Sequence, residues 1–359
     1  PEVEQFPWNV WGRLAGRLWR HPPRAGVGGG ALAGHQGLRD AIAAHVAAVR
    51  GVNCVGHQVM ITSGAQQGLD LIARLLLEPG DKVWMEDPGY AGMRGAFAAT
   101  GAEIVALPVD VDGFDVAAGR ARAPDARLAA VTPSHQYPTG ATMSLARRLE
   151  LLDWARAAGS WVLEDDYNSE YRYAGKPLSA LQGLDDGGRV IYVGTFSKVL
   201  FPGLRLGYAI LPEALVAPFL GMRSMLDDAP ALGLQPVLAE FIKDGHFAAH
   251  VRRTRALYAE RQAHFLTALR RHCGGMLHAA PDEAGMHLVV VLDRSLKLSD
   301  REAAARADVA GISAPALSSY YAGTPAPKGA RQGLVLGYTG FTERETEDGL
   351  KRLAAALAG

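Results

Sequence analysis

Cysteine, net charge and long apolar runs are all scarce in this sequence of 359 residues. The two cysteines, Cys54 and Cys273, have no metal-type spacing, and so few thiols exclude a disulfide framework and favour a reducing, cytoplasmic setting. Lys and Arg together number 37, as do Asp and Glu, which argues against direct binding to nucleic acid or to an anionic membrane. No apolar run approaches the roughly 18 residues of a membrane span.

The sequence also lacks a signal peptide and an initiator methionine, so we expect a piece of a longer protein. A hydrophobic fraction of 48% is typical of a folded, soluble protein rather than a disordered one. A chain of this length most naturally forms one large and one smaller domain.

Seven short apolar runs of strand length follow one another, and helix-patterned segments separate most of them. The runs cover residues 59–62, 83–86, 104–107, 128–132, 161–164, 190–193 and 207–211. The helical patterns cover residues 65–77, 91–100 and 145–158, and another at 38–49 ends at Gly51. This alternation predicts an α/β fold with a mainly parallel seven-stranded sheet that is covered on both faces. Ligands of such sheets gather at the carboxyl ends of the strands.

After about residue 250 the pattern becomes that of a smaller α+β domain. It predicts a helix over 250–271, a strand over 286–292, a helix from about 299, a loop over 324–333, a strand over 335–338 and a final helix from 343. We therefore expect a large domain over 36–250 and a small domain over 251–359. An N-terminal arm over 1–35 is expected to contain an amphipathic helix before a glycine cluster at 26–30.

Lys198 follows two small hydroxyl residues, Thr195 and Ser197, and Arg205 lies seven positions further on. The lysine can form an imine with an aldehyde, the hydroxyls can donate to phosphate, and the arginine offers the bidentate charge that phosphate favours. This combination suits pyridoxal phosphate, which needs a lysine and a partner for its ring nitrogen. A solvated surface lysine is the ordinary alternative. The assignment therefore depends on an acid, a phosphate cradle and a ring-stacking group elsewhere in the chain.

Small residues at the end of the first strand predict the phosphate cradle. Gly64, Ala65 and Gln66 open a helix, and the first amides of a helix point at an anion with a favourable dipole. Small residues also cap many ordinary helices, which is the simpler interpretation of this segment alone. After the next strand, residues 87–89 make a turn and Tyr90 starts a helix, where its ring either stacks on a planar cofactor or belongs to the core.

Three consecutive carboxylates, Glu164, Asp165 and Asp166, end another strand and are followed by Tyr167. Such a cluster is electrostatically costly unless a positive group lies nearby. A ring nitrogen held protonated by Asp165 would meet that need, and Tyr167 could donate to the ring hydroxyl. Metal binding is a rival use, but no further acidic or histidine-rich partner accompanies the cluster, which makes metal the weaker option.

A polar loop, Ser-His-Gln-Tyr-Pro-Thr-Gly at 134–140, follows the strand at 128–132. Its proline and the Thr-Gly pair make a tight turn that leaves His135 and Gln136 available to the site. A single histidine in a loop is usually ordinary.

In this order the motifs resemble fold-type I pyridoxal-phosphate enzymes, the aspartate aminotransferase superfamily, and the resemblance covers nearly the whole chain. The segments 6–8, 134–140, 164–173 and 194–198 more narrowly resemble the aminotransferase-like domain of MocR-type regulators. The resemblance implies a GntR-type winged helix-turn-helix domain before this one, which would be the only part to touch DNA. It also implies a homodimer with sites at the subunit interface.

The resemblance implies a role for each matching position. Lys198 would hold the cofactor as an internal aldimine, Asp165 would pair with the ring nitrogen, and Tyr167 would contact the ring hydroxyl. The residues implied around the cofactor also include Gly64, Ala65, Gln66, Tyr90, His135, Tyr137, Thr195, Ser197 and Arg205. Arg331 is the first candidate to bind a substrate carboxylate and Arg94 is the second. A solvated surface arginine is the alternative for both.

The chain departs from the family pattern at three places. Tyr137 stands where ordinary aminotransferases have an asparagine that holds the ring hydroxyl, and MocR-type proteins share this kind of change. Residues 28–34 are glycine- and alanine-rich where relatives carry a tyrosine that reaches the phosphate of the neighbouring subunit. Val335 falls at the strand position where many aminotransferases place their carboxylate-binding arginine.

Three functions follow from this resemblance. The first is a domain that senses an amine or amino-acid effector through aldimine exchange at Lys198 and controls an attached DNA-binding domain. The second is a working aminotransferase, in which Lys198 moves the proton between the substrate and the cofactor. The third is a lyase or decarboxylase on the same scaffold. The tyrosine at 137 favours sensing.

Overall fold

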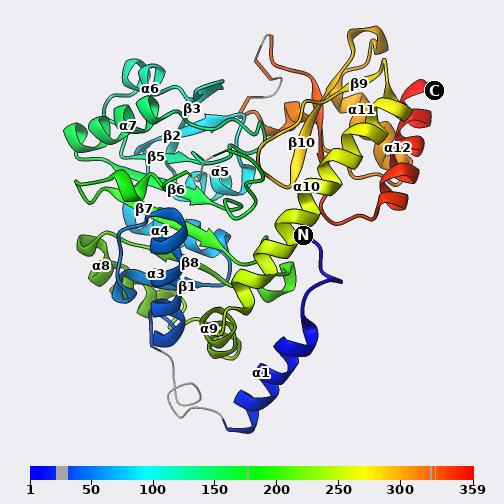
Figure 1. Ribbon diagram of the computed structural model, residues 1–359. Coiled ribbons are helices and arrows are strands. Elements are labelled where there is room, and N and C mark those ends of the chain that lie inside the picture. The colour runs from blue at the N-terminus through cyan, green and yellow to red at the C-terminus, as the bar shows by residue number, and fades with distance from the viewer. Residues whose placement is uncertain (22–30, 176–177, 324–325, 328) are drawn as a thin grey trace.

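The computed structural model describes residues 1–21, 31–175, 178–323, 326–327 and 329–359. Two β-sheets lie side by side, and helices surround them (Figure 1). The predicted glycine cluster at 26–30 and part of the predicted loop at 324–333 lie outside the described residues.

The larger sheet has eight strands in the order β1-β8-β7-β6-β5-β2-β3-β4. They are β1 (Val59–Thr62), β2 (Lys82–Asp87), β3 (Glu103–Asp110), β4 (Gly113–Phe114), β5 (Leu128–Val131), β6 (Trp161–Asp166), β7 (Val190–Thr195) and β8 (Gly207–Ile210). The neighbours from β7 to β3 are parallel, whereas β8 is antiparallel to both β1 and β7. The predicted α/β fold with a mainly parallel sheet is therefore confirmed. The seven predicted strands are all present, and β4 is an added two-residue strand paired with β3.

The helices within the described residues include all those that the sequence predicts. They are α1 (Trp8–Arg20), α3 (Gln36–Arg50), α4 (Ala65–Leu76), α5 (Ala91–Ala98), α6 (Val116–Arg122), α7 (Leu145–Ala158), α8 (Glu213–Leu226), α9 (Gln235–Lys243), α10 (His246–Cys273), α11 (Asp300–Val309) and α12 (Glu343–Ala358). Short 3-10 turns are η1 (Gly56–Gln58), η2 (Gln182–Leu184), η3 (Pro202–Leu204), η4 (Arg294–Leu296) and η5 (Leu317–Tyr320). Gly51 ends α3 in the left-handed conformation with φ of 66°, as predicted for a C-cap.

Both faces of the large sheet are buried. Val83 and Met85 of β2 pack into a cluster with α4, α5 and α8, whereas Trp84 between them packs on the other face with α6 and α7. Side chains of a strand alternate between its faces, so two-sided burial requires apolar residues at successive positions. This explains why the strands read as continuous apolar runs in the sequence.

The smaller sheet is antiparallel and has the order β11-β10-β9. Its strands are β9 (Leu277–His278), β10 (His287–Leu292) and β11 (Gly333–Gly337). Residues of the second half of α10, of α11 and of α12 pack on it in a separate apolar cluster. The 28-residue helix α10 begins in the cluster that covers β1, β7 and β8 and ends in this one (Figure 1). The domain boundaries near residues 35 and 250 stay predictions, and the second would fall inside α10.

The N-terminal arm packs against the large sheet's helices. Phe6 and Trp11 are buried, and the ring of Phe6 lies 5.0 Å from that of Phe201 and 5.7 Å from that of Phe241 in α9. The amphipathic helix expected in this arm is α1. The arm is thereby fixed beside the loop that carries Lys198.

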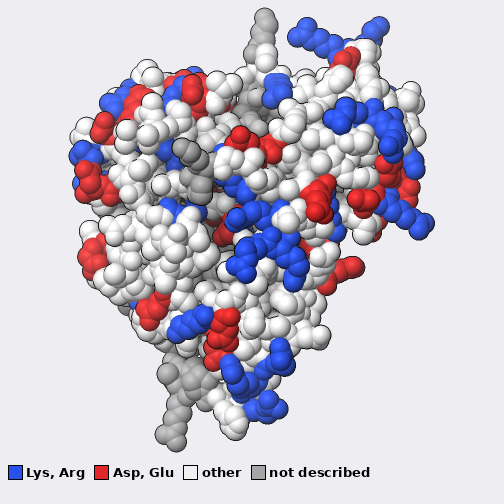
Figure 2. Space-filling model, in the orientation of Figure 1, with Lys and Arg blue, Asp and Glu red and all other residues white. Residues whose placement is uncertain are grey.

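Basic and acidic side chains are interspersed on the face shown in Figure 2, with a basic group near its centre over α10. Arg252, Arg253 and Arg255 of α10 are exposed, and Arg255 donates to the backbone carbonyl of Glu170. In the described part of the chain, no helix has the length and apolar character needed to cross a membrane.

Candidate functional site

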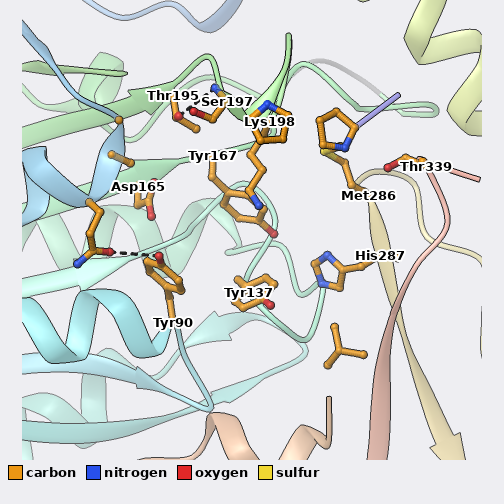
Figure 3. A pocket seen from close by; sticks show the side chains of 18 of the residues that line it. Tyr90, Tyr137, Asp165, Tyr167, Thr195, Ser197, Lys198, Met286, His287 and Thr339 are labelled. Atoms are coloured by element: carbon orange, nitrogen blue, oxygen red, sulfur yellow. Dashed lines mark hydrogen bonds between the residues drawn. The ribbon is translucent and has the colours of Figure 1, made fainter. Parts of the chain in front are cut away.

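A cavity of about 650 Å³ opens where the carboxyl ends of the parallel strands face the smaller sheet (Figure 3). Its lining includes eleven of the predicted site residues: Gly64, Ala65, Gln66, Tyr90, Tyr137, Asp165, Tyr167, Thr195, Ser197, Lys198 and Arg205. Segments up to 141 residues apart in sequence thus supply the lysine, the acid and the phosphate cradle to one place, as the positions of Gly64 and Arg205 illustrate. The sequence predicted this convergence from the strand ends.

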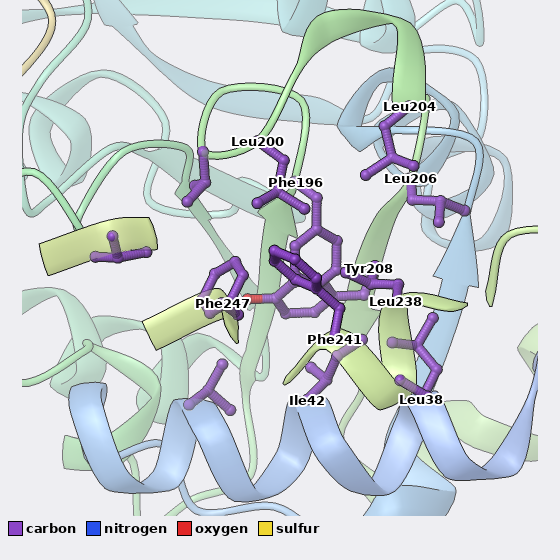
Figure 4. Close-up of a cluster of buried hydrophobic side chains, with 14 of the residues drawn as sticks. Leu38, Ile42, Phe196, Leu200, Leu204, Leu206, Tyr208, Leu238, Phe241 and Phe247 are labelled. Atoms are coloured by element: carbon purple, nitrogen blue, oxygen red, sulfur yellow. The ribbon is translucent and has the colours of Figure 1, made fainter. Parts of the chain in front are cut away.

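The backbone of the loop after β7 fixes Lys198 at the cavity. Phe196, Val199 and Leu200 on either side of it are buried in the apolar cluster behind the loop, in which Figure 4 labels Phe196 and Leu200. Lys198 itself lines the cavity (Figure 3). The carbonyl of Val199 accepts hydrogen bonds from the Tyr171 hydroxyl and from Nε2 of His250, each at 3.0 Å. Apolar packing on one side and two buried donors therefore hold the lysine backbone in place.

The three carboxylates at the end of β6 have different partners. Glu164 accepts from the backbone N–H groups of Leu181 and Gln182, each at 2.9 Å, and Asp166 pairs with the guanidinium of Arg50 at 2.8 Å. Asp165 alone faces the cavity, and its Oδ1 is buried without a hydrogen-bond partner among the described residues. Two of the carboxylates are therefore structural, and one is available to a ligand.

Asp165 fits a protonated ring nitrogen. Burial is the largest cause that raises the pKa of Asp165 from 3.8 to about 7, and the nearby carboxylates of Asp166 and Glu86 contribute to the same shift. A positive group beside Oδ1 would reverse that shift, because an opposite charge favours the ionised carboxylate. An orphaned carboxylate oxygen at a planar, aromatic-lined cavity is the arrangement that the predicted cofactor requires.

The opposite end of the cavity suits a phosphate. Gly64 has φ of 90° at the start of α4, and Arg205 has φ of 50°, a left-handed conformation that non-glycine residues rarely adopt. The Arg205 guanidinium donates to the carbonyl of Ser63 at 3.1 Å and lies close to Gly64. The Ser197 hydroxyl is buried without a partner in the described structure, so it is free to donate to an anion. Ser63 itself is absent from the lining of this cavity as described.

Replacing Arg205 with alanine is expected to weaken the binding of pyridoxal phosphate to the cofactor-free protein by roughly 10- to 100-fold. A hydrogen bond to a charged group contributes about 1.5–3 kcal/mol, and about 1.4 kcal/mol corresponds to a factor of ten. Lysine at this position keeps the charge but not the guanidinium fork, so its effect should be intermediate. Fluorescence titration with the cofactor measures both variants, with the exposed Arg344 changed to alanine as the control. Native affinity in the Arg205 variant would contradict the phosphate assignment.

Three tyrosines form an aromatic wall of the cavity. The ring of Tyr137 lies 6.2 Å from that of Tyr90 and 5.9 Å from that of Tyr167, both in edge-to-face geometry. The Tyr90 hydroxyl donates to the side-chain oxygen of Gln66 at 3.1 Å, and the Gln66 amide donates to the carbonyl of Gly92. Burial raises the pKa of Tyr137 and of Tyr167 above the ordinary value, so both stay neutral and can donate.

His135 lies behind this wall rather than in the lining. Its Nδ1 is 3.1 Å from the Tyr167 hydroxyl and its Nε2 is 3.0 Å from Oδ2 of Asp282, which precedes β10. A Cβ on Gly285 would lie 2.4 Å from the His135 ring, so only glycine leaves room for this contact. The predicted cofactor residue His135 therefore reaches the site through Tyr167.

The two arginines predicted to bind a carboxylate are not in the cavity lining as described. The Arg94 guanidinium donates to the backbone carbonyls of Tyr320 and Tyr321, at 2.5 and 3.1 Å. Arg331 precedes β11 and is exposed. Neither position supports the predicted contact with a substrate in this cavity.

Sequence reasoning missed the half of the lining that the smaller sheet and its loops supply. The missed residues include Met286, His287, Ser313, Pro315, Tyr320, Gly337, Thr339, Gly340 and Phe341, whereas the resemblance had already singled out Val335 of the same lining. The Tyr320 and Tyr137 hydroxyls are 3.0 Å apart, and Nε2 of His287 donates to the Pro138 carbonyl at 3.0 Å, so these residues join the two sides of the cavity. The polar segment directly after β11 was the one local signal that could have identified part of this set.

The family model for aminotransferase class I and II matches residues 28–318 of the chain. Among curated proteins, the chain is 41% identical over 357 residues to the probable rhizopine catabolism regulatory protein MocR of Rhizobium meliloti, covering 99% of this chain and 71% of that one. It is 36% identical over 327 residues to the HTH-type transcriptional regulator YdeL of Bacillus subtilis, covering 91% of this chain and 69% of that one.

Solved structures of aminotransferases have the same fold. The LysN α-aminoadipate aminotransferase of Thermus thermophilus, complexed with N-(5'-phosphopyridoxyl)-L-leucine, superposes with a TM-score of 0.88 at 28% identity, covering 100% of this chain and 90% of that one. The kynurenine aminotransferase of Pyrococcus horikoshii, in complex with PMP, also gives a TM-score of 0.88 at 27% identity, covering 100% and 89%.

Proposed function

This chain belongs to the aminotransferase class I and II family, and we propose that it is the effector-sensing part of a MocR-type transcriptional regulator. Its cofactor is pyridoxal phosphate. When bound, this cofactor supplies an aldehyde carbon that holds a primary amine covalently and allows one amine to replace another. In the proposal, an amine or amino-acid effector takes the place of Lys198 there, and the conformation of the site responds.

The observation that carries the proposal is that the predicted cofactor residues converge on one cavity in a chain with regulator relatives. Lys198, Asp165 and Arg205 face one cavity, where they can hold an aldehyde, a ring nitrogen and a phosphate. The two curated relatives described above, which match 99% and 91% of this chain, are named as regulators, and one of them is named as HTH-type. We further propose that the chain pairs with a second copy and acts on DNA through a winged helix-turn-helix domain.

Contacts across the cavity support a conformational response. The Tyr137–Tyr320 hydroxyl pair, the His287–Pro138 hydrogen bond and the Asp282–His135 contact all join the large-sheet side to the small-sheet side. A ligand between these groups meets both sides, so it can favour one arrangement of the two sheets over another.

Tyr137 favours sensing over turnover. Its hydroxyl is paired with Tyr320 at 3.0 Å, and its ring contacts that of His287 at 5.1 Å. The residue therefore links the cofactor wall to the opposite side of the cavity. An asparagine at this position, as in ordinary aminotransferases, is too short to span to Tyr320.

Absorbance spectroscopy of the cofactor-loaded protein tests the proposal. We expect candidate amines to shift the visible band of the lysine-bound cofactor saturably, without conversion of the cofactor to pyridoxamine phosphate and without transfer of the amino group to an added keto acid. Rapid, complete conversion over many cycles would contradict sensing and identify a working aminotransferase. The protein carrying its helix-turn-helix domain should also change its affinity for operator DNA with the same amine.

A further inference from the structure

We propose that the effector of this site is a hydroxylated primary amine that has no carboxylate. This inference rests on the proposed sensing function and narrows it, because a sensor of this family could otherwise bind either an amine or an amino acid. The argument comes from the charges, the strand geometry and the hydrogen-bonding groups of the cavity on the small-sheet side.

Cations at the cavity are already committed to the cofactor. In the lining, as far as the chain is described, Lys198 and Arg205 are the Lys and Arg side chains, and they face the aldehyde and the phosphate. Arg94 is bound to two backbone carbonyls, and Arg331 is exposed outside the lining. A carboxylate that enters a buried site without a cationic partner loses its hydration and gains little in return. The cavity therefore disfavours an amino acid.

The small-sheet strand that faces the cavity carries an apolar side chain at the central position. Leu334 and Leu336 of β11 pack into the small-sheet core, so the alternation of the strand turns Val335 to the other side, where it lines the cavity with Gly337. An arginine at 335 would project into the same space. The structure thus places a short hydrocarbon where an anion-binding group would have the reach and direction to meet a ligand.

His287 offers an acceptor rather than a cation. Its Nε2 donates to the Pro138 carbonyl, since a carbonyl oxygen can only accept, and this leaves Nδ1 as a lone pair in the neutral ring. Burial is the largest cause that lowers the pKa of His287 to about 4, and the nearby His135 contributes to the same shift, so the ring is neutral at physiological pH. A lone pair repels a carboxylate and accepts a hydrogen bond from a hydroxyl or an ammonium group.

Hydroxyl groups complete the polar lining on this side. Ser313, Tyr320 and Thr339 line the cavity, and the two tyrosine hydroxyls at 137 and 320 share one hydrogen bond, which leaves one of their protons for a ligand. Neutral donors and acceptors of this kind match alcohol groups, because a hydroxyl both donates and accepts hydrogen bonds. They favour a ligand that is neutral apart from its amine.

Matched probes test this inference. Serinol is the analogue of serine in which a hydroxymethyl group replaces the carboxylate, so the pair differs only in the group at issue. We expect the cofactor-loaded protein to bind serinol about tenfold or more tightly than L-serine, which corresponds to about 1.4 kcal/mol. Displacement of the visible band and calorimetry measure both affinities without turnover. Equal or tighter binding of L-serine would overturn the inference.

Two variants at one position separate charge from size. Val335→Arg should move the serinol-to-serine affinity ratio by about tenfold towards serine, because it adds the missing cation. Val335→Gln has a similar length and no charge, so its ratio should stay near that of the native protein. A Val335→Gln ratio that moves as far as that of Val335→Arg would contradict the charge argument. Retention of the visible band and of the melting temperature checks that each variant is folded. If neither variant folds, the serinol-to-serine affinity ratio of the native protein decides the inference by itself.

The two proposals fail in different ways. If the visible band responds neither to the two probes nor to any amine or amino acid in a wider panel, both the sensing function and this inference are overturned. A clear response to amino acids with none to their alcohol analogues would leave sensing intact and overturn only the claim about the carboxylate.

Discussion

Replacing Lys198 with alanine is expected to abolish the covalent link to pyridoxal phosphate altogether. Lys198 is the one lysine in the cavity lining, over the residues that the structure describes, so no other lysine lies there to replace it. The visible absorbance of the lysine-bound cofactor should disappear. Borohydride reduction followed by mass spectrometry should find no phosphopyridoxyl label on the peptide that contains position 198.

Two controls separate chemistry from folding in that experiment. Lys198→Arg keeps the positive charge but cannot form the same link, so it should also lose the label while keeping the native melting temperature. Lys351→Ala changes a lysine of α12 that pairs with Asp348 on the surface, and it should keep both the band and the label. A band that survives in Lys198→Ala would overturn the assignment of the cofactor site.

Changing Asp165 to asparagine is expected to weaken the affinity for the cofactor by about 100-fold or more. Removing one partner of a buried ion pair costs about 3–5 kcal/mol, and Asp165 is the buried carboxylate whose free oxygen faces the ring position. The neutral amide cannot hold the ring nitrogen in its protonated form. Fluorescence titration of the cofactor-free variant gives the affinity, with Asp186→Asn as a surface control because Asp186 is 79% exposed.

The pH dependence of stability gives this variant a second readout. In the cofactor-free protein the pKa of Asp165 is raised from 3.8 to about 7, so the folded chain holds this proton more tightly than the unfolded chain. Its contribution to the free energy of unfolding is therefore largest below pH 4 and is lost as the pH rises towards 7. Asp165→Asn should flatten that part of the slope. Glu86 and Glu170 also have pKa values raised to about 7, so only the difference between variant and native protein is diagnostic.

The sequence predicted the strands of the large sheet well because burial on both faces leaves a simple signal. Trp84, for example, is apolar like its neighbours although it packs on the opposite face from them. The two-residue strands β4 and β9 gave no comparable signal because they are shorter than any pattern. Helix α8 was also missed, since Pro218 lies inside it and interrupts the usual helical pattern.

The site was predictable on one side only. Asp165 lies at the carboxyl end of β6, and Gly64 and Lys198 lie within three residues after β1 and β7, and strands that run in the same direction bring such positions to one edge. His287 and Val335 belong to an antiparallel sheet, where the register between β10 and β11 decides which residues face the cavity. No local pattern reports that register. Arg94 and Arg331 were plausible ligands of a carboxylate by residue type. Their spatial surroundings, which the sequence does not give, place Arg94 against two backbone carbonyls and leave Arg331 exposed.

Helix α10 gives the molecule a mechanical property as well as a scaffold. Its 28 residues contain neither proline nor glycine, and at about 1.5 Å per residue they form a rod about 42 Å long. Phe247 near its start packs in the cluster behind Lys198, and Leu269 near its end packs in the small-sheet core. When a stiff helix of this length tilts about one end, the other end moves in proportion to the length, so a tilt of about 5° moves the far end by about 4 Å. A small rotation of α10 beside the cofactor would therefore move the small-sheet end of the helix by several ångströms.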